Sequence, residues 1–181
     1  LKNNSHNNQD VIKIYITGGS LGSDFINKNI PVAIGSLKAS IEVKHQSGIG
    51  KSEGIMALYS KDILVEVEEF YECPQEIILW ADFVISRAGA LTLSEVISMN
   101  KGSLMIPFPS SIDNHQLLNA QMVENNKMGI IHEESESNEL LCKRLQNIVD
   151  KRLFSQWQEF ENEIDHFQAS QRMLSSILKI Q

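Results

Sequence analysis

The stretch from Ser86 to Glu95 combines a turn of small residues with one carboxylate, and both could take part in chemistry. Its serine, alanines and glycine have little side chain, so another molecule can approach the backbone there. A turn that opens a helix leaves the first helical N–H groups unpaired, and the helix dipole favours an anion such as phosphate at that point. Glu95 follows about one helical turn after Leu91, where a carboxylate suits the hydroxyls of a ribose. The stretch therefore predicts a nucleotide site, although the same small residues would also let a helix pack closely on a sheet.

A second glycine-rich turn, Gly18 to Gly22, follows the first apolar run of the chain. The hydroxyl of Ser20 stands where it could donate to a phosphate oxygen, although serine is also favoured in such turns for structural reasons. The glycine spacing does not match the G-x-G-x-x-G pattern of dinucleotide sites. The next predicted strand also lacks the acid that usually ends it in those sites.

Two further groups of polar residues follow predicted strands. His45 and Gln46 stand at the end of one, and a histidine in that position is more often a hydrogen-bonded structural residue than a catalyst. The run from Asp113 to Gln116 supplies donors and acceptors of the kind that a sugar needs. The alternative is that Asp113 or Asn114 only caps a helix and that the remaining residues are solvated.

The elements that must position these residues alternate between strands and helices. The predicted strands are 11–17, 40–46, 63–70, 83–85, 103–107 and 129–132. The predicted helices are 24–37 with Ser23 or Asp24 as its cap, a short one at 52–59, 73–80, one from about 90, one ending near 125, 138–150 and 153–179. This alternation predicts an α/β fold, a Rossmann-like parallel sheet of about six strands with helices on both faces. The strand ends would then bring the polar groups to one edge of the sheet.

Composition narrows the class of protein. The chain has 181 residues and a formal net charge of −7, which argues against broad binding to nucleic acid. The two cysteines, Cys73 and Cys142, lack metal-type spacing, and a reduced, cytoplasmic protein is the simpler interpretation. No apolar run approaches the length of a membrane span. The acidic stretch Glu133 to Glu139 is predicted to be a solvated connection.

Three segments are predicted along the chain. Residues 1–10 are polar and read as a linker remnant, and residues 11–152 form the Rossmann-like domain. Residues 153–181 form a C-terminal helix whose apolar stripe includes Trp157 and Phe167. That stripe would pack either toward a neighbouring domain or on the sheet of this domain.

Several motifs in the same order resemble the carboxyl-terminal half of the MurG family. They are Gly18–Gly22 with Asn27, His45–Gly48, Glu69–Phe70, Trp80–Asp82, Ser86–Glu95, Pro107, and Asp113–Gln116 with Asn119–Ala120. MurG is the bacterial transferase that adds N-acetylglucosamine to lipid I, which gives the lipid II precursor of peptidoglycan. The resemblance implies one half of a GT-B glycosyltransferase fold, with 11–152 as the part that binds UDP-N-acetylglucosamine.

The resemblance also implies which residues bind this donor: Ser20, Tyr71, Ala90, Leu91, Thr92, Leu93, Ser94, Glu95, His115 and Gln116. Ser20 would bind the diphosphate, together with the first amides of the helix after the small-residue turn. The backbone around Tyr71 would contact the uracil edge, and Glu95 would hold the ribose. His115 and Gln116 would face the N-acetylglucosamine. The helix N-terminus and Ser20 would stabilise the charge on the departing UDP, so the resemblance implies neither a metal ion nor a cofactor.

The chain departs from the family pattern at a few positions. Tyr71 stands where the family often has an aliphatic residue, and Asn100 to Gly102 replaces a more usual Gly-x-Pro. The amino-terminal domain, which in the family supplies the catalytic base and meets both the lipid acceptor and the membrane, has no counterpart here. The catalytic residues therefore stay unknown. The resemblance places the full-length protein on the cytoplasmic face of the inner membrane, with the membrane contact outside this half.

Two alternatives remain open at this point. The first is the donor subunit of a two-chain, lipid-linked N-acetylglucosamine transferase that docks on a membrane partner. The second is a non-enzymatic nucleotide-binding module, which would bind UDP without a preference for the sugar.

Overall fold

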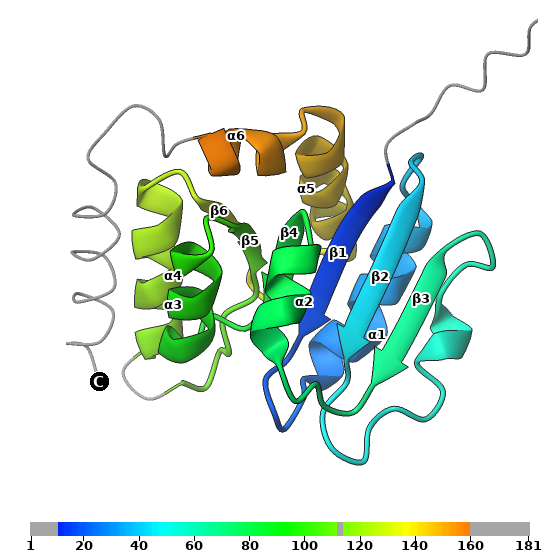
Figure 1. The fold of residues 1–181 in the computed structure, drawn as a ribbon. Helices are drawn as coiled ribbons and strands as arrows, with labels where there is room; N and C mark the ends of the chain where they lie inside the picture. Colours follow the sequence, from blue (N-terminus) through cyan, green and yellow to red (C-terminus); the bar gives the residue numbers. More distant parts are fainter. Residues whose placement is uncertain (1–10, 112–113, 160–181) are drawn as a thin grey trace, which may run out of the picture.

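Six parallel strands form one sheet in the computed structural model, which describes residues 11–111 and 114–159 (Figure 1). The strands are β1 Ile12–Thr17, β2 Ile41–Gln46, β3 Leu64–Glu68, β4 Phe83–Ser86, β5 Gly102–Met105 and β6 Gly129–Ile131. Their order across the sheet is β3-β2-β1-β4-β5-β6. The direction of winding therefore reverses between β1 and β4, and in open parallel sheets ligands bind outside the strand carboxyl ends at this point.

Helices cover both faces of the sheet, as the sequence predicts. The helices are α1 Asp24–Gly35, the 3₁₀ turn η1 Met56–Leu58, α2 Pro74–Trp80, α3 Ala90–Ser98, α4 His115–Asn125, α5 Asn138–Asp150 and α6 Leu153–Glu159. Figure 1 shows α2, α3 and α4 in front of the sheet, with α1 and α5 behind it. The predicted fold class is confirmed.

The two faces follow from the side-chain alternation within the strands. Ile14 and Ile16 of β1 are fully buried in the core that includes α1 and α5, whereas Tyr15 packs with Ile78 of α2 and Val96 of α3. Successive residues of a strand point to opposite faces, so a strand buried on both sides reads as a continuous apolar run. The short apolar run that begins at Phe83, in β4, is likewise buried on both faces of the sheet.

Local signals in the sequence account for most element boundaries. Ser23 caps α1, and its Oγ accepts a hydrogen bond of 3.3 Å from the Ile26 amide, as one of the two predicted caps. The predicted helix 52–59 is wrong, because only the 3₁₀ turn η1 forms there. Gly50 and Gly54 have φ angles of +73° and +77°, which interrupt a right-handed helix.

The described part of the C-terminal segment packs on this domain. Phe154 and Trp157 of α6 are buried against Phe83, and their ring centroids lie 6.0 and 6.4 Å from the Phe83 ring. The Trp157 ring lies so close to Gly102 that any Cβ there would come within 2.1 Å of it. The predictions for residues 1–10, and for the helix beyond Glu159 with the rest of its apolar stripe, lie outside the described residues.

Candidate functional site

The turn between β4 and α3 presents the start of a helix at the switch point of the sheet. Gly89 is the N-cap of α3 and offers no side-chain cap. The first intrahelical bond runs from the Leu93 amide to the Gly89 carbonyl, at 3.0 Å, so the amides of Ala90, Leu91 and Thr92 precede it. Leu91 is 70% exposed. These amides are therefore available to an anion, as the sequence predicts for this turn.

Leu93 and Ser94 lie deeper in α3 than the sequence suggests for contact with a ligand. The Leu93 side chain is fully buried in the core between α3 and α4. The Ser94 Oγ is buried and has no hydrogen-bond partner among the described residues. The backbone of these two residues, rather than the Leu93 side chain, is therefore the part that could border a ligand.

Glu95 faces the first turn of α2. Its carboxylate accepts a hydrogen bond of 2.8 Å from the Gln75 side chain, and the contact is exposed. The bond joins the first turn of α2 to the second turn of α3. A ligand with hydroxyl groups could donate to the remaining lone pairs of this carboxylate.

Tyr71 follows β3 at the same edge of the sheet. Its hydroxyl donates to the Glu66 carboxylate at 2.9 Å, and Lys44 lies 5.9 Å from its ring centroid. The Tyr71 amide donates to the Gln46 side chain at 3.2 Å. The side chain is thus held against β2 and β3, and the backbone is the part of Tyr71 that borders the site.

The turn after β1 carries Ser20 at its exposed tip. The Gly22 amide closes this turn by donating to the Gly19 carbonyl at 3.1 Å. Gly22 has a φ of +67°, and any Cβ there would lie 1.9 Å from the Ser47 carbonyl oxygen. The glycine therefore lets the turns after β1 and β2 touch backbone to backbone, which fixes the position of Ser20.

His45 supports these two turns from below and does not reach the crevice. Its ring is fully buried, with Nδ1 2.8 Å from the Tyr59 hydroxyl and Nε2 3.0 Å from the Asn27 Oδ1. The Asn27 amide nitrogen donates to the Ser47 carbonyl at 2.9 Å, so its Oδ1 is an acceptor for a proton on Nε2. Burial lowers the pKa of His45 to about 4. The prediction that this histidine is structural is confirmed.

The loop between β5 and α4 brings Gln116 to the opposite end of the site. Gln116 Oε1 accepts a hydrogen bond of 2.9 Å from the Phe108 amide, and the Gln116 amide donates to the Ser111 hydroxyl at 3.4 Å. His115 is half-buried in the first turn of α4. Asn114 takes the N-cap position with a left-handed φ of 55°, and its side chain makes no capping bond. The capping alternative therefore does not explain the Asn114 side chain, and Asp113, the other candidate cap, lies outside the described residues.

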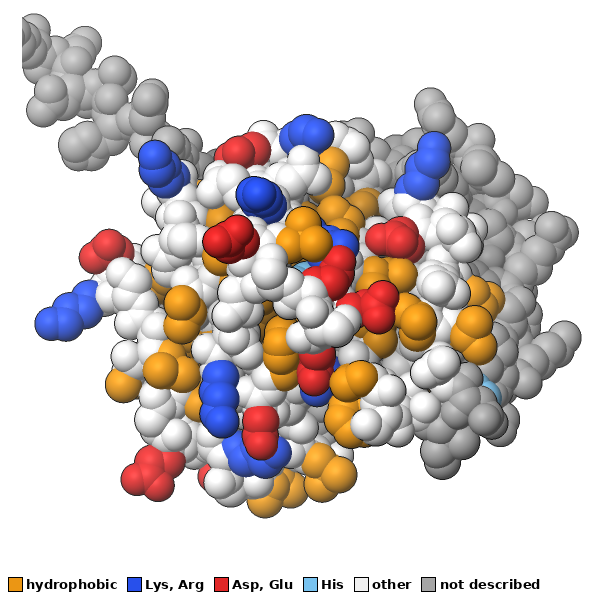
Figure 2. All heavy atoms as spheres, turned by 180° about the vertical axis from the view of Figure 1, so that it is seen from behind, with side chains coloured by type: hydrophobic (Ala, Val, Ile, Leu, Met, Phe, Trp, Pro, Cys, Tyr) orange, Lys and Arg blue, Asp and Glu red, His pale blue; other side chains and the backbone are white. Residues whose placement is uncertain are grey.

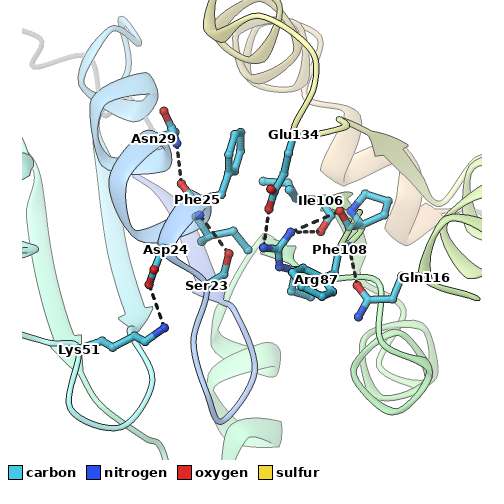
Figure 3. A network of polar contacts seen from close by, with 12 residues as sticks. Ser23, Asp24, Phe25, Asn29, Lys51, Arg87, Ile106, Phe108, Gln116 and Glu134 are labelled. Carbon is cyan, nitrogen blue, oxygen red and sulfur yellow. Dashed lines mark hydrogen bonds and ion pairs between the residues drawn. The ribbon is translucent and has the colours of Figure 1, made fainter. Parts of the chain in front are cut away.

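Arg87 ties this loop to two other segments (Figure 3). Its Nη1 donates to the carbonyls of Ile106 and Pro107 at 3.1 and 3.3 Å, and its guanidinium lies 5.3 Å from the Phe108 ring centroid. Its Nη2 forms an ion pair of 2.5 Å with Glu134, and these side chains are only 13% and 22% exposed. Arg87 thus joins the ends of β4, β5 and β6.

The acidic stretch after β6 is therefore only in part the solvated connection that the sequence predicts: Glu133 and Glu139 are exposed, whereas Glu134 and Glu136 are held in ion pairs. Glu134 is held by Arg87, and Glu136 receives two hydrogen bonds from Arg144, which also contacts His132 Nδ1 at 2.8 Å. The bond from Arg144 lowers the pKa of Glu136, and burial together with Arg144 lowers the pKa of His132. A partly buried arginine needs a carboxylate, and this requirement recruits acids that look like surface residues in the sequence.

A hollow of about 470 Å³ lies beside this network. Its lining joins the turn after β1 to the loop between β5 and α4 and to the acidic stretch, and includes Gly18, Leu21, Phe25, Lys51, Arg87, Phe108, Gln116 and Glu134. Figure 3 shows Asp24 and Lys51 on one side of the hollow and Gln116 on the other. Seen from the side of α1 and α5, side chains of both charge signs are interspersed with apolar ones (Figure 2).

Sequence reasoning missed the roles of Arg87 and Glu134. Arg87 was visible as a cation directly after a buried strand, inside a turn of small residues. Glu134 follows β6 by three residues, which is a comparable position at the same sheet edge. The signal that could have found the pair is a charged residue just after the carboxyl end of each of these strands, because a charge that is buried there needs a partner of opposite sign.

The described residues contain neither a metal-binding cluster nor a membrane-spanning helix. In residues 11–111 and 114–159, no group of three or more His, Cys, Asp or Glu side chains is arranged to hold a metal ion. Over the same residues, no helix has both the length and the apolar character needed to cross a membrane.

The strand order, the helix start at the switch point and the glycine turn beside it define one half of a GT-B glycosyltransferase fold. The model of the glycosyltransferase family 28 C-terminal domain matches residues 13–173, and the chain belongs to this family. A crystal structure of MurG from Acinetobacter baumannii is similar, with a TM-score of 0.77 at 27% identity, over 93% of this chain and 50% of that one. The glycosyltransferase of kitacinnamycin shares the fold, with a TM-score of 0.63 at 15% identity, over 92% of this chain and 40% of that one.

Curated relatives carry one name, UDP-N-acetylglucosamine–N-acetylmuramyl-(pentapeptide) pyrophosphoryl-undecaprenol N-acetylglucosamine transferase. The relative from Shewanella sediminis is 40% identical over 63% of this chain and 33% of its own length. The relative from Psychrobacter cryohalolentis is 32% identical over 77% of this chain and 39% of its own length. The resemblance to the carboxyl-terminal half of the MurG family is confirmed. The chain spans about a third of the length of these curated relatives.

Proposed function

We propose that this chain is the donor-binding part of an inverting glycosyltransferase, which transfers N-acetylglucosamine from UDP-N-acetylglucosamine to lipid I and forms lipid II in peptidoglycan synthesis. The observation that carries the proposal is that the family's donor-binding motifs meet at one sheet edge. The turns after β1, β3 and β4 and the loop after β5 all end there. The name shared by the curated relatives supplies the donor and the acceptor.

The geometry supports an extended donor along this edge. The uracil would meet the backbone at Tyr71, and the ribose hydroxyls would donate to Glu95. The diphosphate would lie between the hydroxyl of Ser20 and the first amides of α3. The N-acetylglucosamine would then reach Gln116 and His115. This order follows the sheet from β3 to β5, with the diphosphate at the switch point between β1 and β4.

The residues at the diphosphate would also promote transfer. When the glycosidic bond breaks, negative charge grows on the departing UDP. The amides at the start of α3 and the hydroxyl of Ser20 would lie beside that charge and would stabilise it. This part of the chain accounts for departure of the leaving group, whereas the base that activates the acceptor would belong to the remaining length of the relatives.

Transfer therefore requires more than this chain, and we expect the chain alone to transfer little. The lipid I acceptor and the membrane contact would be met by the part of the relatives that this chain does not span. The complete protein would act at the cytoplasmic face of the inner membrane, where such an acceptor presents its sugar.

Calorimetric titration of this chain with UDP-N-acetylglucosamine, UDP-glucose and NAD tests the proposal. We expect saturable one-to-one binding of the first ligand, weaker binding of UDP-glucose and none of NAD. Equal binding of all three would point to a general nucleotide module, and preferential binding of NAD would contradict the donor assignment.

A further inference from the structure

One buried side chain connects the two segments that would hold the base and the diphosphate. Gln46, the last residue of β2, is 5% exposed. Its Nε2 lies 3.2 Å from both the Thr17 hydroxyl and the Gly19 carbonyl, in the turn after β1. Its Oε1 accepts from the Tyr15 hydroxyl at 3.3 Å and from the Tyr71 amide at 3.2 Å.

The fixed backbone partners determine the orientation of this carboxamide. The Gly19 carbonyl can only accept a hydrogen bond, and the Tyr71 amide can only donate one. If the Gln46 carboxamide were turned over, its oxygen would face the first group and its nitrogen the second, and both contacts would be repulsive. The position therefore requires a neutral side chain that donates on one side and accepts on the other.

Tyr15 fits the same pattern of neutral groups. Burial is the largest cause that raises the pKa of Tyr15, to about 12, so its hydroxyl stays protonated at neutral pH and can donate to Gln46. Thr17 completes the arrangement, since its Oγ1 also accepts from the Gly19 amide at 3.0 Å. Gln46 thus satisfies its donors and acceptors within the protein, and it has no need of a ligand.

The sheet order explains why this one residue can reach both segments. Strand β2 lies between β1 and β3, so a side chain at its carboxyl end is adjacent to the turns that follow both neighbours. The peptide that joins Phe70 to Tyr71 takes its orientation from the bond to Gln46. The glycine turn that carries Ser20 is held from the same point, because the adjacent Gly19 carbonyl is bound.

We propose that Gln46 is a positioning residue for uracil selectivity, which sets the Tyr71 backbone relative to the turn that carries Ser20. The inference rests on the proposed function, because it assumes that the base meets the Tyr71 backbone. Gln46 itself touches neither base nor phosphate. It acts by holding the Tyr71 backbone and the turn that carries Ser20 at the spacing that a uridine diphosphate spans. A base with a different pattern of donors and acceptors would not form the contact to the Tyr71 backbone, so it would bind more weakly.

The test compares the affinities of this chain for UDP, CDP and UDP-N-acetylglucosamine, measured by calorimetry for the unmodified chain and for Gln46→Met. Methionine has a similar volume and cannot make these hydrogen bonds. We expect UDP to bind about tenfold more weakly, which is the effect of one or two lost neutral hydrogen bonds, and CDP to lose less, because CDP shares the diphosphate turn but not the uracil contact. The ratio of the UDP-N-acetylglucosamine affinity to the UDP affinity should stay constant, since the sugar end is untouched.

A second variant separates the contact of Gln46 to the Tyr71 amide from its contact to the Gly19 carbonyl. Gln46→Glu keeps an acceptor for the Tyr71 amide but places a carboxylate oxygen against the Gly19 carbonyl. We expect it to weaken UDP relative to uridine, because the diphosphate turn is displaced, and to keep more of the preference for uridine over cytidine than Gln46→Met. Gln146→Met is the matched control, because among the described residues the Gln146 side chain donates to Asp150 alone, in an exposed contact within α5.

The outcomes distinguish the two proposals. If the unmodified chain binds UDP and Gln46→Met keeps the full preference for UDP over CDP, the positioning role is overturned and the donor assignment stands. If the unmodified chain binds neither UDP nor UDP-N-acetylglucosamine, the donor assignment fails and takes this inference with it. Should Gln46→Met not fold, as judged by circular dichroism, the comparison of UDP with uridine in Gln46→Glu decides: an unchanged UDP-to-uridine ratio overturns the proposal.

Discussion

The two ends of the crevice are held together by different kinds of interaction. At the β1 to β3 end, neutral groups do this: the carboxamide of Gln46 and the imidazole of His45 sit buried among hydroxyl, amide and carbonyl partners. At the β4 to β6 end, the pairs Arg87 with Glu134 and Arg144 with Glu136 hold the loops. The first arrangement does not depend on charge balance, whereas the second fails if either partner of a pair is lost.

The difference matches how closely the segments approach one another. The turns after β1 and β2 touch backbone to backbone at Gly22, so neutral bonds suffice to fix them. The connection from Met105 to His115 is closed instead by the bond from Phe108 to Gln116. A long arginine side chain can reach several carbonyls and an acid at once, which a short neutral side chain cannot do.

Removal of Arg87 should have the largest effect on the free energy of unfolding at the β4 to β6 end. Arg87→Met keeps much of the packing on Phe108 but leaves Glu134 partly buried without its cation. We expect a loss of about 3 kcal/mol in the free energy of unfolding, at the lower end for a buried pair because both side chains retain some exposure. Urea denaturation followed by circular dichroism measures this loss.

The exposed ion pair in the same hollow is the matched control. Lys51 lies 2.9 Å from Asp24, with the two side chains 38% and 72% exposed, so Lys51→Met should leave the denaturation midpoint almost unchanged. A similar loss of stability in Arg87→Met and Lys51→Met would show that burial does not distinguish the two pairs.

Acid should weaken the opposite end of the crevice through His45. The pKa of His45 is lowered to about 4 in the folded chain, against about 6.5 in the unfolded chain, so the unfolded state binds more protons between these values. The contribution of the neutral imidazole to the free energy of unfolding is fully present above pH 6.5 and is lost as the pH falls toward 4. The maximum loss is about 3 kcal/mol, from about 2.5 pKa units.

Denaturation at pH 7.0, 5.5 and 4.5 measures this slope. His45→Gln retains polar contacts without a titrating ring, and its stability should depend less steeply on pH over this range than that of the unmodified chain. Other groups, His132 included, titrate in both proteins and cancel in the difference. Equal slopes would contradict the assignment of a strongly lowered pKa to His45.

Removal of Glu95 should weaken the donor rather than the fold. Glu95→Ala deletes the acceptor proposed for the ribose hydroxyls and leaves Gln75 exposed to water. We expect UDP-N-acetylglucosamine to bind about 1–3 kcal/mol more weakly, which is the range for a lost hydrogen bond to a charged group. Calorimetric titration with UDP-N-acetylglucosamine and with UDP should show the same loss, because both ligands carry the ribose.

Asp150→Ala is the control for this loss, since it removes the same charge at the end of α5, outside the crevice. If both variants lose affinity equally, the effect of Glu95→Ala is one of net charge and not of a specific contact. If neither loses affinity, the ribose assignment is wrong.

The sequence predicted the sheet and the positions of the turns because these depend on short-range patterns. The apolar run at Phe83, the glycines from Gly18 to Gly22 and the cap at Ser23 each fix local backbone, and the parallel alternation then places them at one edge. Asparagine tolerates a left-handed backbone, and Asn100, which stands where the family pattern has glycine, has a φ of 55°. These features could be read without knowledge of any distant contact.

The pairings across the site could not be predicted in this way. Arg87 and Glu134 are far apart in sequence, and Gln46 reaches Gly19 and Tyr71 only because β2 lies between β1 and β3. Which acid accepts a buried cation depends on loop conformations that no local pattern specifies. For this reason the sequence predicts only a solvated connection after β6.

Gln116 gives the smallest expected effect, and it separates the sugar from the rest of the donor. Its Oε1 is engaged by the Phe108 amide, while its carboxamide nitrogen carries two protons that could donate to sugar hydroxyls. We expect Gln116→Ala to weaken UDP-N-acetylglucosamine by about 1 kcal/mol and UDP by much less. Gln116→Glu keeps the acceptor for the Phe108 amide but cannot donate, so a loss of sugar preference in both variants would assign the effect to the donated bonds. If only Gln116→Ala loses this preference, Gln116 supports the loop and does not contact the sugar. If the unmodified chain shows no preference for UDP-N-acetylglucosamine over UDP, the non-enzymatic nucleotide module becomes the better account of this crevice.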